Sequence, residues 1–89
     1  MIRVSTVQES DHLVKMKVEG EIVSDYVNCL SEECERLLES TERVELDFSE
    51  VMFVDANGVE MLRNLESERI AIVNASPLVE ELLHLSKRK

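Results

Sequence analysis

Residues 44–62 have the sequence VELDFSEVMFVDANGVEML, and this stretch decides the fold. Its first five residues alternate apolar and polar side chains, which predicts a β-strand with one buried face. A short apolar run follows at residues 51–54, and Asp55, a residue type that commonly caps helices, comes next. Val59 and Leu62 then have the spacing of one helix face. The stretch therefore predicts a strand that leads almost directly into a helix.

The part of the chain before this stretch predicts a hairpin and a helix. Apolar and polar residues alternate over residues 2–6 and 14–18, and the polar residues 9–12 between them favour a turn. We expect these two strands to be antiparallel, with one face in solvent. Ser24 is expected to cap a helix over residues 25–39. Its apolar stripe comprises Val27, Leu30, Cys34, Leu37 and Leu38.

The part after it predicts one more strand and one more helix. Residues 70–73 form an apolar run without alternation, which is typical of a strand covered on both faces. Ser76 is expected to cap the last helix, with Pro77 in the first position, where its missing N–H costs nothing. The apolar face of this helix comprises Leu78, Val79, Leu82, Leu83 and Leu85.

The predicted order of elements is therefore β-β-α-β-α-β-α. Strands that alternate with helices imply parallel pairs joined by right-handed crossovers. We expect an α/β fold in which a small mixed β-sheet of about four strands is packed against three helices. The length of 89 residues fits a single domain over residues 1–89.

Charge restricts the classes of partner. The chain has 19 Asp and Glu against 10 Lys and Arg, which gives a formal net charge of −9. Nucleic acids and anionic membrane surfaces both require clustered basic residues, so neither is expected as a partner. Long-range attraction would instead favour a protein partner that is basic or of mixed charge. We find no signal peptide and no apolar run that could span a bilayer, so we expect a cytoplasmic protein without direct membrane insertion.

The sequence does not predict an enzyme. With two glycines, the chain has no glycine-rich phosphate loop, and it lacks the HExxH, CxxC and G-x-S-x-G patterns. Cys29 and Cys34 are five residues apart, so on a helix they lie about 140° apart and point to different faces. Both are expected to be ordinary reduced cysteines. We therefore expect no catalytic residues, no metal site and no cofactor.

Three segments together resemble the STAS domain, the fold of bacterial anti-sigma factor antagonists. The first is residues 44–62, where an apolar strand with Asp and Ser is followed by an apolar-Asp-x-x-Gly-apolar stretch. The second is VEGEI at residues 18–22, and the third is IAIVNASPLV at residues 70–79. The resemblance covers about residues 13–86. It implies a non-catalytic domain that binds a protein partner and acts in bacterial signalling and transcription regulation.

The resemblance also implies a phosphorylation switch, from which this chain departs. In the family, a Ser or Thr just before the glycine is phosphorylated by a partner anti-sigma factor kinase, and this releases the complex. The matching position is Asn57, which has no hydroxyl, and Ala56 removes the neighbouring hydroxyl as well. Asn is neutral, so it resembles the unphosphorylated side chain. We therefore hypothesise a domain that stays in its partner-binding state. A simple alternative is that Asn57-Gly58 is only a turn at a helix start.

The resemblance places partner binding at the second helix and its leading turn. The residues expected there are Asp55, Ala56, Asn57, Gly58, Glu60 and Met61. The expected partner is an anti-sigma factor of the kinase type. The ATPase subunit of an ABC-type lipid transporter is the alternative, because small STAS-like proteins also serve as accessory subunits there. An enzyme or nucleotide-binding domain is a third alternative, against which the missing glycine loop argues. The predicted sheet is minimal, and a partner or a second copy in a homodimer could complete its edge.

Overall fold

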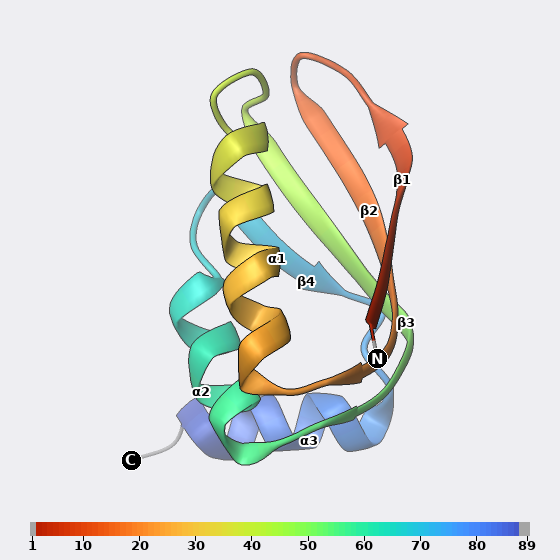
Figure 1. The fold of residues 1–89 in the computed structure, drawn as a ribbon, viewed down its shortest axis with the longest axis vertical. Coiled ribbons are helices and arrows are strands. Elements are labelled where there is room, and N and C mark those ends of the chain that lie inside the picture. The colour runs from red at the N-terminus through yellow and green to blue at the C-terminus, as the bar shows by residue number, and fades with distance from the viewer. Residues whose placement is uncertain (1, 88–89) are drawn as a thin grey trace.

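The computed structural model describes residues 2–87, including all side chains except those of Ser24 and residues 84–87. The elements follow in the predicted order (Figure 1). They are β1 (Ile2–Glu9), β2 (Leu13–Ile22), α1 (Ser24–Leu37), β3 (Arg43–Val54), α2 (Ala56–Leu65), β4 (Ile70–Val73) and α3 (Pro77–Lys87).

The four strands form one mixed sheet in the order β1-β2-β3-β4. β1 and β2 are antiparallel, as the hairpin prediction required. β2 pairs with β3, and β3 with β4, in parallel, so α1 and α2 are the crossovers between them. The predicted α/β fold is confirmed. Within the described residues, no helix is long and apolar enough to cross a lipid bilayer.

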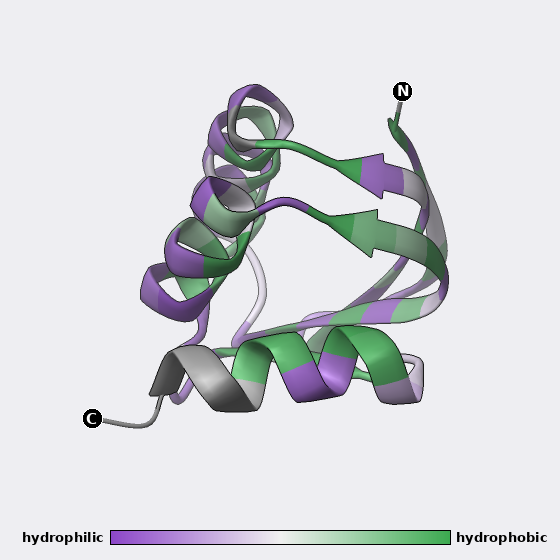
Figure 2. Cartoon of the chain, turned by 90° about the horizontal axis from the view of Figure 1, so that it is seen from below, coloured by the Kyte–Doolittle hydropathy of each residue, from purple (hydrophilic) through white to green (hydrophobic). Residues whose placement is uncertain are grey.

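The core lies between the sheet and the helices. On β2, Val14, Met16 and Val18 are buried, and they alternate with half-buried charged residues. The apolar sides of α1 and α2 face the sheet in Figure 2, while their outer sides are more polar. The other face of the sheet carries charges, among them Lys15, whose Nζ lies 3.8 Å from Glu45 Oε1. One face of the sheet is therefore covered by helices, and the other is polar.

β3 is longer than the alternation over residues 44–48 indicates. Its pairing with β2 shifts register twice, once between Lys17 and Glu19 and once between Gly20 and Glu21. In each shift β3 contributes one more residue than β2 does, which is the pattern of a β-bulge. The buried positions after Phe48 are consequently Val51 and Val54, spaced by three instead of two. The apolar run at residues 51–54 is thus the bulged end of one strand.

Ser24 does not cap the first helix, contrary to the prediction. The helix begins at Ser24 itself, and the N-cap is Val23, whose backbone is extended. The Val23 carbonyl accepts the N–H of Tyr26 at 2.9 Å, so the helical hydrogen bonds already start there. The first helix is therefore shifted toward the N-terminus and has no side-chain cap, because valine offers no acceptor.

Two further predictions about burial were wrong. β4 is an edge strand in which Ile70 is buried and the other three residues are half-buried, so it is not covered on both faces. Its short apolar run therefore does not mark a central strand. Leu78 is 57% exposed, because the buried side of α3 centres on Val79 and Leu83. The Ser76 cap is confirmed: Val79 N–H donates to Ser76 Oγ at 3.2 Å. The side chain of Leu85 lies outside the described residues.

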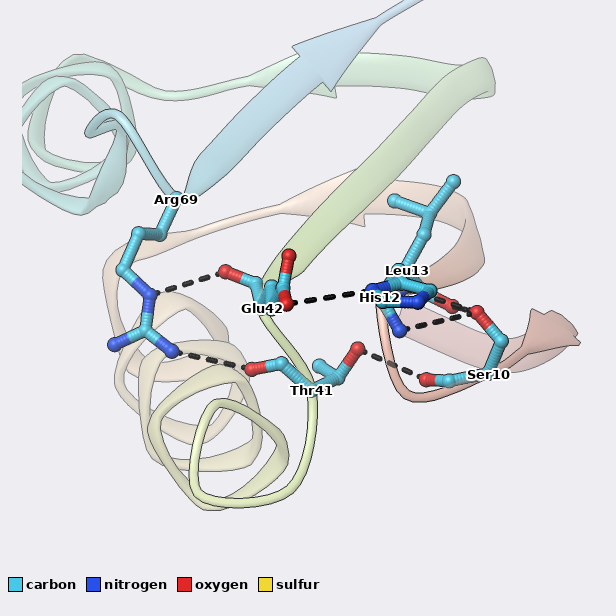
Figure 3. A network of polar contacts seen from close by, with 6 residues as sticks. All are labelled: Ser10, His12, Leu13, Thr41, Glu42 and Arg69. Carbon is cyan, nitrogen blue, oxygen red and sulfur yellow. Dashed lines mark hydrogen bonds and ion pairs between the residues drawn. The ribbon is translucent and has the colours of Figure 1, made fainter.

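The end of the molecule with the β1–β2 turn is held by polar contacts to backbone (Figure 3). The Arg69 guanidinium donates to three carbonyls: those of Leu38 at 2.9 Å, Glu42 at 3.0 Å and Thr41 at 3.1 Å. The buried Thr41 hydroxyl donates to the Ser10 carbonyl at 2.9 Å. Arg69 thus ties the turn before β4 to the carbonyls that follow α1. These contacts fix the loops at the end of β3 remote from α2.

Candidate functional site

The candidate site is the N-terminus of α2, which directly follows the carboxyl end of the parallel strand β3 (Figure 1). Asp55 is the N-cap of the helix, as predicted, and its Oδ1 accepts the N–H of Gly58 at 2.6 Å. The Asp55 N–H donates to the Ile22 carbonyl at 3.1 Å, and the Asp55 carbonyl accepts the Val59 N–H at 2.9 Å. Backbone and side-chain contacts of Asp55 therefore fix the helix start to the end of β2.

Gly58 is required by close packing. A Cβ atom at this position would lie 2.9 Å from Asp55 Oδ1, 3.0 Å from Val54 Cγ1 and 3.2 Å from the Ile22 carbonyl oxygen. Ordinary carbon contacts lie at about 3.5–4.0 Å, so a larger residue would push the helix start away from the sheet. Gly58 thus allows the helix start to approach the backbone of β2 closely, and its part in partner binding stays a prediction. Because Gly58 is buried, it positions the helix start without being part of the accessible surface.

The other predicted site residues differ in how accessible they are. Ala56, Asn57 and Glu60 are exposed, and Asp55 is half-buried. Met61 is also half-buried and packs against the core. It lines a groove of about 240 Å³ between α1 and α2, together with Val27, Asn28, Ser31, Glu35, Asn64, Leu65 and Ile70. The accessible face of the helix start thus comprises Ala56, Asn57 and Glu60, and Met61 lies at its edge.

The sequence interpretation missed two apolar residues beside this face. Met52 is 75% exposed and Phe53 is 46% exposed, although both lie in the apolar run that leads into α2. Strict alternation from Val44 would have placed Glu50 inside the core, and an unpaired buried charge is costly. That conflict is the signal that could have indicated a bulge and the outward turn of the residues after it.

The described residues contain no group of three or more His, Cys, Asp or Glu side chains that could hold a metal ion. Cys29 is exposed and Cys34 buried, as their spacing predicted, and neither forms a disulfide. Burial, with a smaller contribution from Glu33 and Glu35, raises the pKa of the Cys34 thiol to about 11. A thiol that stays protonated is a poor nucleophile.

One carboxylate on the open face of the sheet is perturbed. The pKa of Asp47 is lowered, mainly because its carboxylate accepts the Ser49 N–H at 2.9 Å. The Ser49 hydroxyl, the Asn74 side chain and the charge of Lys17 act in the same direction. Asn74 follows β4 and has a positive φ of 59°, which asparagine tolerates. These contacts link the open face to the loop after β4.

This arrangement can be compared with known proteins. The family model described as "Mlab, STAS domain" matches residues 5–87, which is nearly the whole chain. The chain belongs to the STAS domain family. Curated protein sequences gave no significant match to this STAS domain.

Solved structures show the same fold. The unphosphorylated form of the anti-sigma factor antagonist SpoIIAA matches with a TM-score of 0.72 and 20% identity, covering 94% of this STAS domain and 80% of that chain. SpoIIAA in its phosphorylated form, described as a Bacillus cell fate determinant, has a TM-score of 0.65 and 18% identity, with coverage of 96% and 84%. An antisigma-factor antagonist STAS domain from Rhodobacter sphaeroides has a TM-score of 0.60 and 23% identity, with coverage of 85% and 92%. At these identities the likeness concerns the fold.

Proposed function

We propose that this STAS domain is a non-catalytic interaction module of the anti-sigma factor antagonist type, which binds a kinase-type anti-sigma factor through the start of α2. The observation that carries the proposal is the fixed position of the α2 N-terminus. Asp55 caps it, Gly58 seats it against β2, and the adjoining side chains are left exposed. A binding surface on a rigid element loses little entropy when the partner docks.

Residue 57 sets how such binding is regulated. The first N–H groups of a helix have no partner within it and carry partial positive charge, so the helix tolerates a phosphate there. Such a phosphate would add about −1.5 to −2 charges to the surface. The Asn57 amide cannot accept one. Binding by this domain is therefore proposed to be constitutive, without release by phosphorylation at this position.

The lack of a hydroxyl also favours a second candidate partner, the ATPase subunit of an ABC-type lipid transporter. An accessory subunit in such an assembly needs no kinase to act on residue 57. The two candidates predict different partners for the same surface. Titration of the purified domain against each protein from the source cell separates them, because only one of the two should bind.

The surface itself is tested by a charge reversal with a matched control. Glu60→Lys is expected to weaken binding by at least about 10-fold, as for a residue inside an interface. Glu32→Lys changes the net charge equally, and Glu32 is exposed on α1. This control is expected to leave the affinity within about 2-fold, as for a residue outside the interface. Unchanged binding by Glu60→Lys would remove this surface from the proposal.

The regulatory part has its own test. The wild type incubated with the kinase partner and ATP is expected to gain no phosphate at residue 57. Asn57→Ser should accept a phosphate and then dissociate from the partner, because the hydroxyl is restored at the helix start. If Asn57→Ser binds the kinase but stays unmodified, residue 57 is not the position equivalent to the phosphorylated serine.

A further inference from the structure

An exposed apolar pair lies directly before the candidate site. Met52 and Phe53 are 75% and 46% exposed, and Val54 alone separates them from the helix cap Asp55. Soluble domains leave single apolar residues exposed without consequence, but neighbouring ones beside a binding site often mark an interaction surface. This pair therefore directly precedes the helix start in the chain.

The pairing of β3 explains why these side chains point outward. β3 pairs with β4 only from Val44 to Asp47, whereas its pairing with β2 continues to Val54. Among the described residues, the final part of β3 thus has a strand neighbour on one side alone. The second register shift lies here, and bulges commonly redirect side chains next to functional sites. The exposure follows from the backbone arrangement of this segment.

Acidic side chains surround the pair. Glu21 is paired with Phe53 across the β2–β3 ladder, and Glu19 with Glu50. Met52 lines an open groove of about 310 Å³ with Ile2, Arg3, Glu19, Gly20 and Glu50. Arg3 is the one basic residue in that lining, and it lies opposite Glu19 in the β1–β2 pairing. Asp55 and Glu60 continue the negative charge along the helix start.

We propose that Met52 and Phe53 form the apolar centre of a docking surface for a protein partner with an apolar pocket rimmed by Lys and Arg. Complementary charges around such a pocket would steer the encounter and set the orientation, while the two side chains supply the buried contact. A second copy of this chain would bring the same carboxylates together, which opposes a homodimer through this surface. Anionic membranes and nucleic acids are repelled for the same reason. The proposal rests on the proposed function and names the chemistry of its partner.

The test uses the full chain and the two candidate partners, the purified kinase-type anti-sigma factor and the transport ATPase subunit. Met52→Ser and Phe53→Ser, singly and combined, are compared by calorimetric titration with the wild type and with Val7→Ser. Val7 is the matched control, because it is 64% exposed on β1, away from α2. The double variant is expected to raise the dissociation constant by at least about 30-fold and Val7→Ser by less than about 2-fold. Binding should also weaken as salt is raised from about 50 to 500 mM, since added salt shortens the screening length.

Each outcome decides between the proposals. If neither partner binds the wild type, the proposed function and this docking surface both fail. If a partner binds and Glu60→Lys disrupts the complex while the double variant binds normally, the docking surface is wrong and the proposed function stands. Two other occupants of this surface are a second copy of the chain and an anionic membrane. Sedimentation of the chain alone, and in the presence of anionic vesicles, tests for both. A dimer, or vesicle binding, that is lost in the double variant would overturn the proposal. Thermal melting of each variant checks that it is folded.

Discussion

A methyl group at position 58 is the sharpest test of how α2 is attached to the sheet. In an ordinary exposed helix, Gly→Ala stabilises by about 1 kcal/mol, because alanine loses less backbone entropy. Here the new Cβ would lie 2.9 Å from the Asp55 Oδ1 that caps the helix and 3.2 Å from the Ile22 carbonyl oxygen. Gly58→Ala is therefore expected to destabilise the domain, which is the opposite of its usual effect in a helix.

The magnitude follows from three contributions. Displacing the capping carboxylate costs about 1 kcal/mol, the usual value of an N-cap. Overpacking against Val54 and the Ile22 carbonyl costs about 1–3 kcal/mol, and the helix propensity of alanine returns about 1 kcal/mol. The net expectation for Gly58→Ala is a loss of about 1–3 kcal/mol in the free energy of unfolding.

Urea denaturation followed by circular dichroism measures this change. Asn64→Ala, an exposed position in the same helix, is the control and should stabilise by about 0.5 kcal/mol. The double variant Asp55→Ala/Gly58→Ala should lose at least about 0.5 kcal/mol less than the two single changes together, because both act on the same carboxylate. A stabilised Gly58→Ala protein, or strictly additive losses, would refute the close-packing argument.

Four other predictions concern the rest of the domain. Arg69→Ala should lower the free energy of unfolding by about 1–2 kcal/mol. Arg69→Lys should recover only part of this loss, because one ammonium cannot reach three carbonyls with the geometry of a guanidinium. Equal stability of the wild type and Arg69→Ala in urea would contradict this prediction. An alkylating reagent should modify Cys29 quickly and Cys34 only on unfolding. The pKa of Cys34 is raised to about 11, so its contribution to stability is complete below about pH 9 and is lost toward pH 11. In this range the free energy of unfolding should fall by at most about 1.4 kcal/mol per pH unit. The Cys34→Ala variant should lack this fall. Because the pKa of Asp47 is lowered, its contribution to stability is present above about pH 4 and is lost as the pH falls further. The Asp47→Asn variant should therefore lose less stability than the wild type when both are titrated with acid. Identical stability curves in acid would count against the Ser49 contact.

Alternation and capping residues in the sequence were enough to predict the order of elements and the sheet. The inward residues of β2 and the first half of β3 have a period of two, and Asp55 is the cap that its residue type indicates. Both signals are local, so neither depends on how the chain packs. Local signals failed where tertiary context decides: the apolar run of β4 predicted a strand covered on both faces, but β4 lies at an edge of the sheet.

The candidate site was only partly predictable for the same reason. The Asp55 cap could be placed from its residue type, and the resemblance to the STAS family marked Gly58 and the stretch around it. The exposure of Met52 and Phe53 depends on the bulges of β3, which only the position of Glu50 indicates in the sequence, and on the short length of β4, which no local pattern encodes. Met61 is half-buried because α1 passes beside α2 and forms a groove with it, a contact between residues far apart in the sequence. The prediction that these residues bind a partner stays a prediction.

The hydrogen bond that caps α2 runs from Gly58 to Asp55 and bypasses the exposed residue 57. Folding therefore constrains the two flanking residues strongly and residue 57 hardly at all. Mutation can exchange the side chain at this position freely, and codons for asparagine and serine differ by a single nucleotide. If residue 57 is the position equivalent to the phosphorylated residue, as proposed above, a lineage gains or loses covalent control of the domain in one step, with no compensating change in its core. For protein engineering, position 57 is a natural place to install a switch.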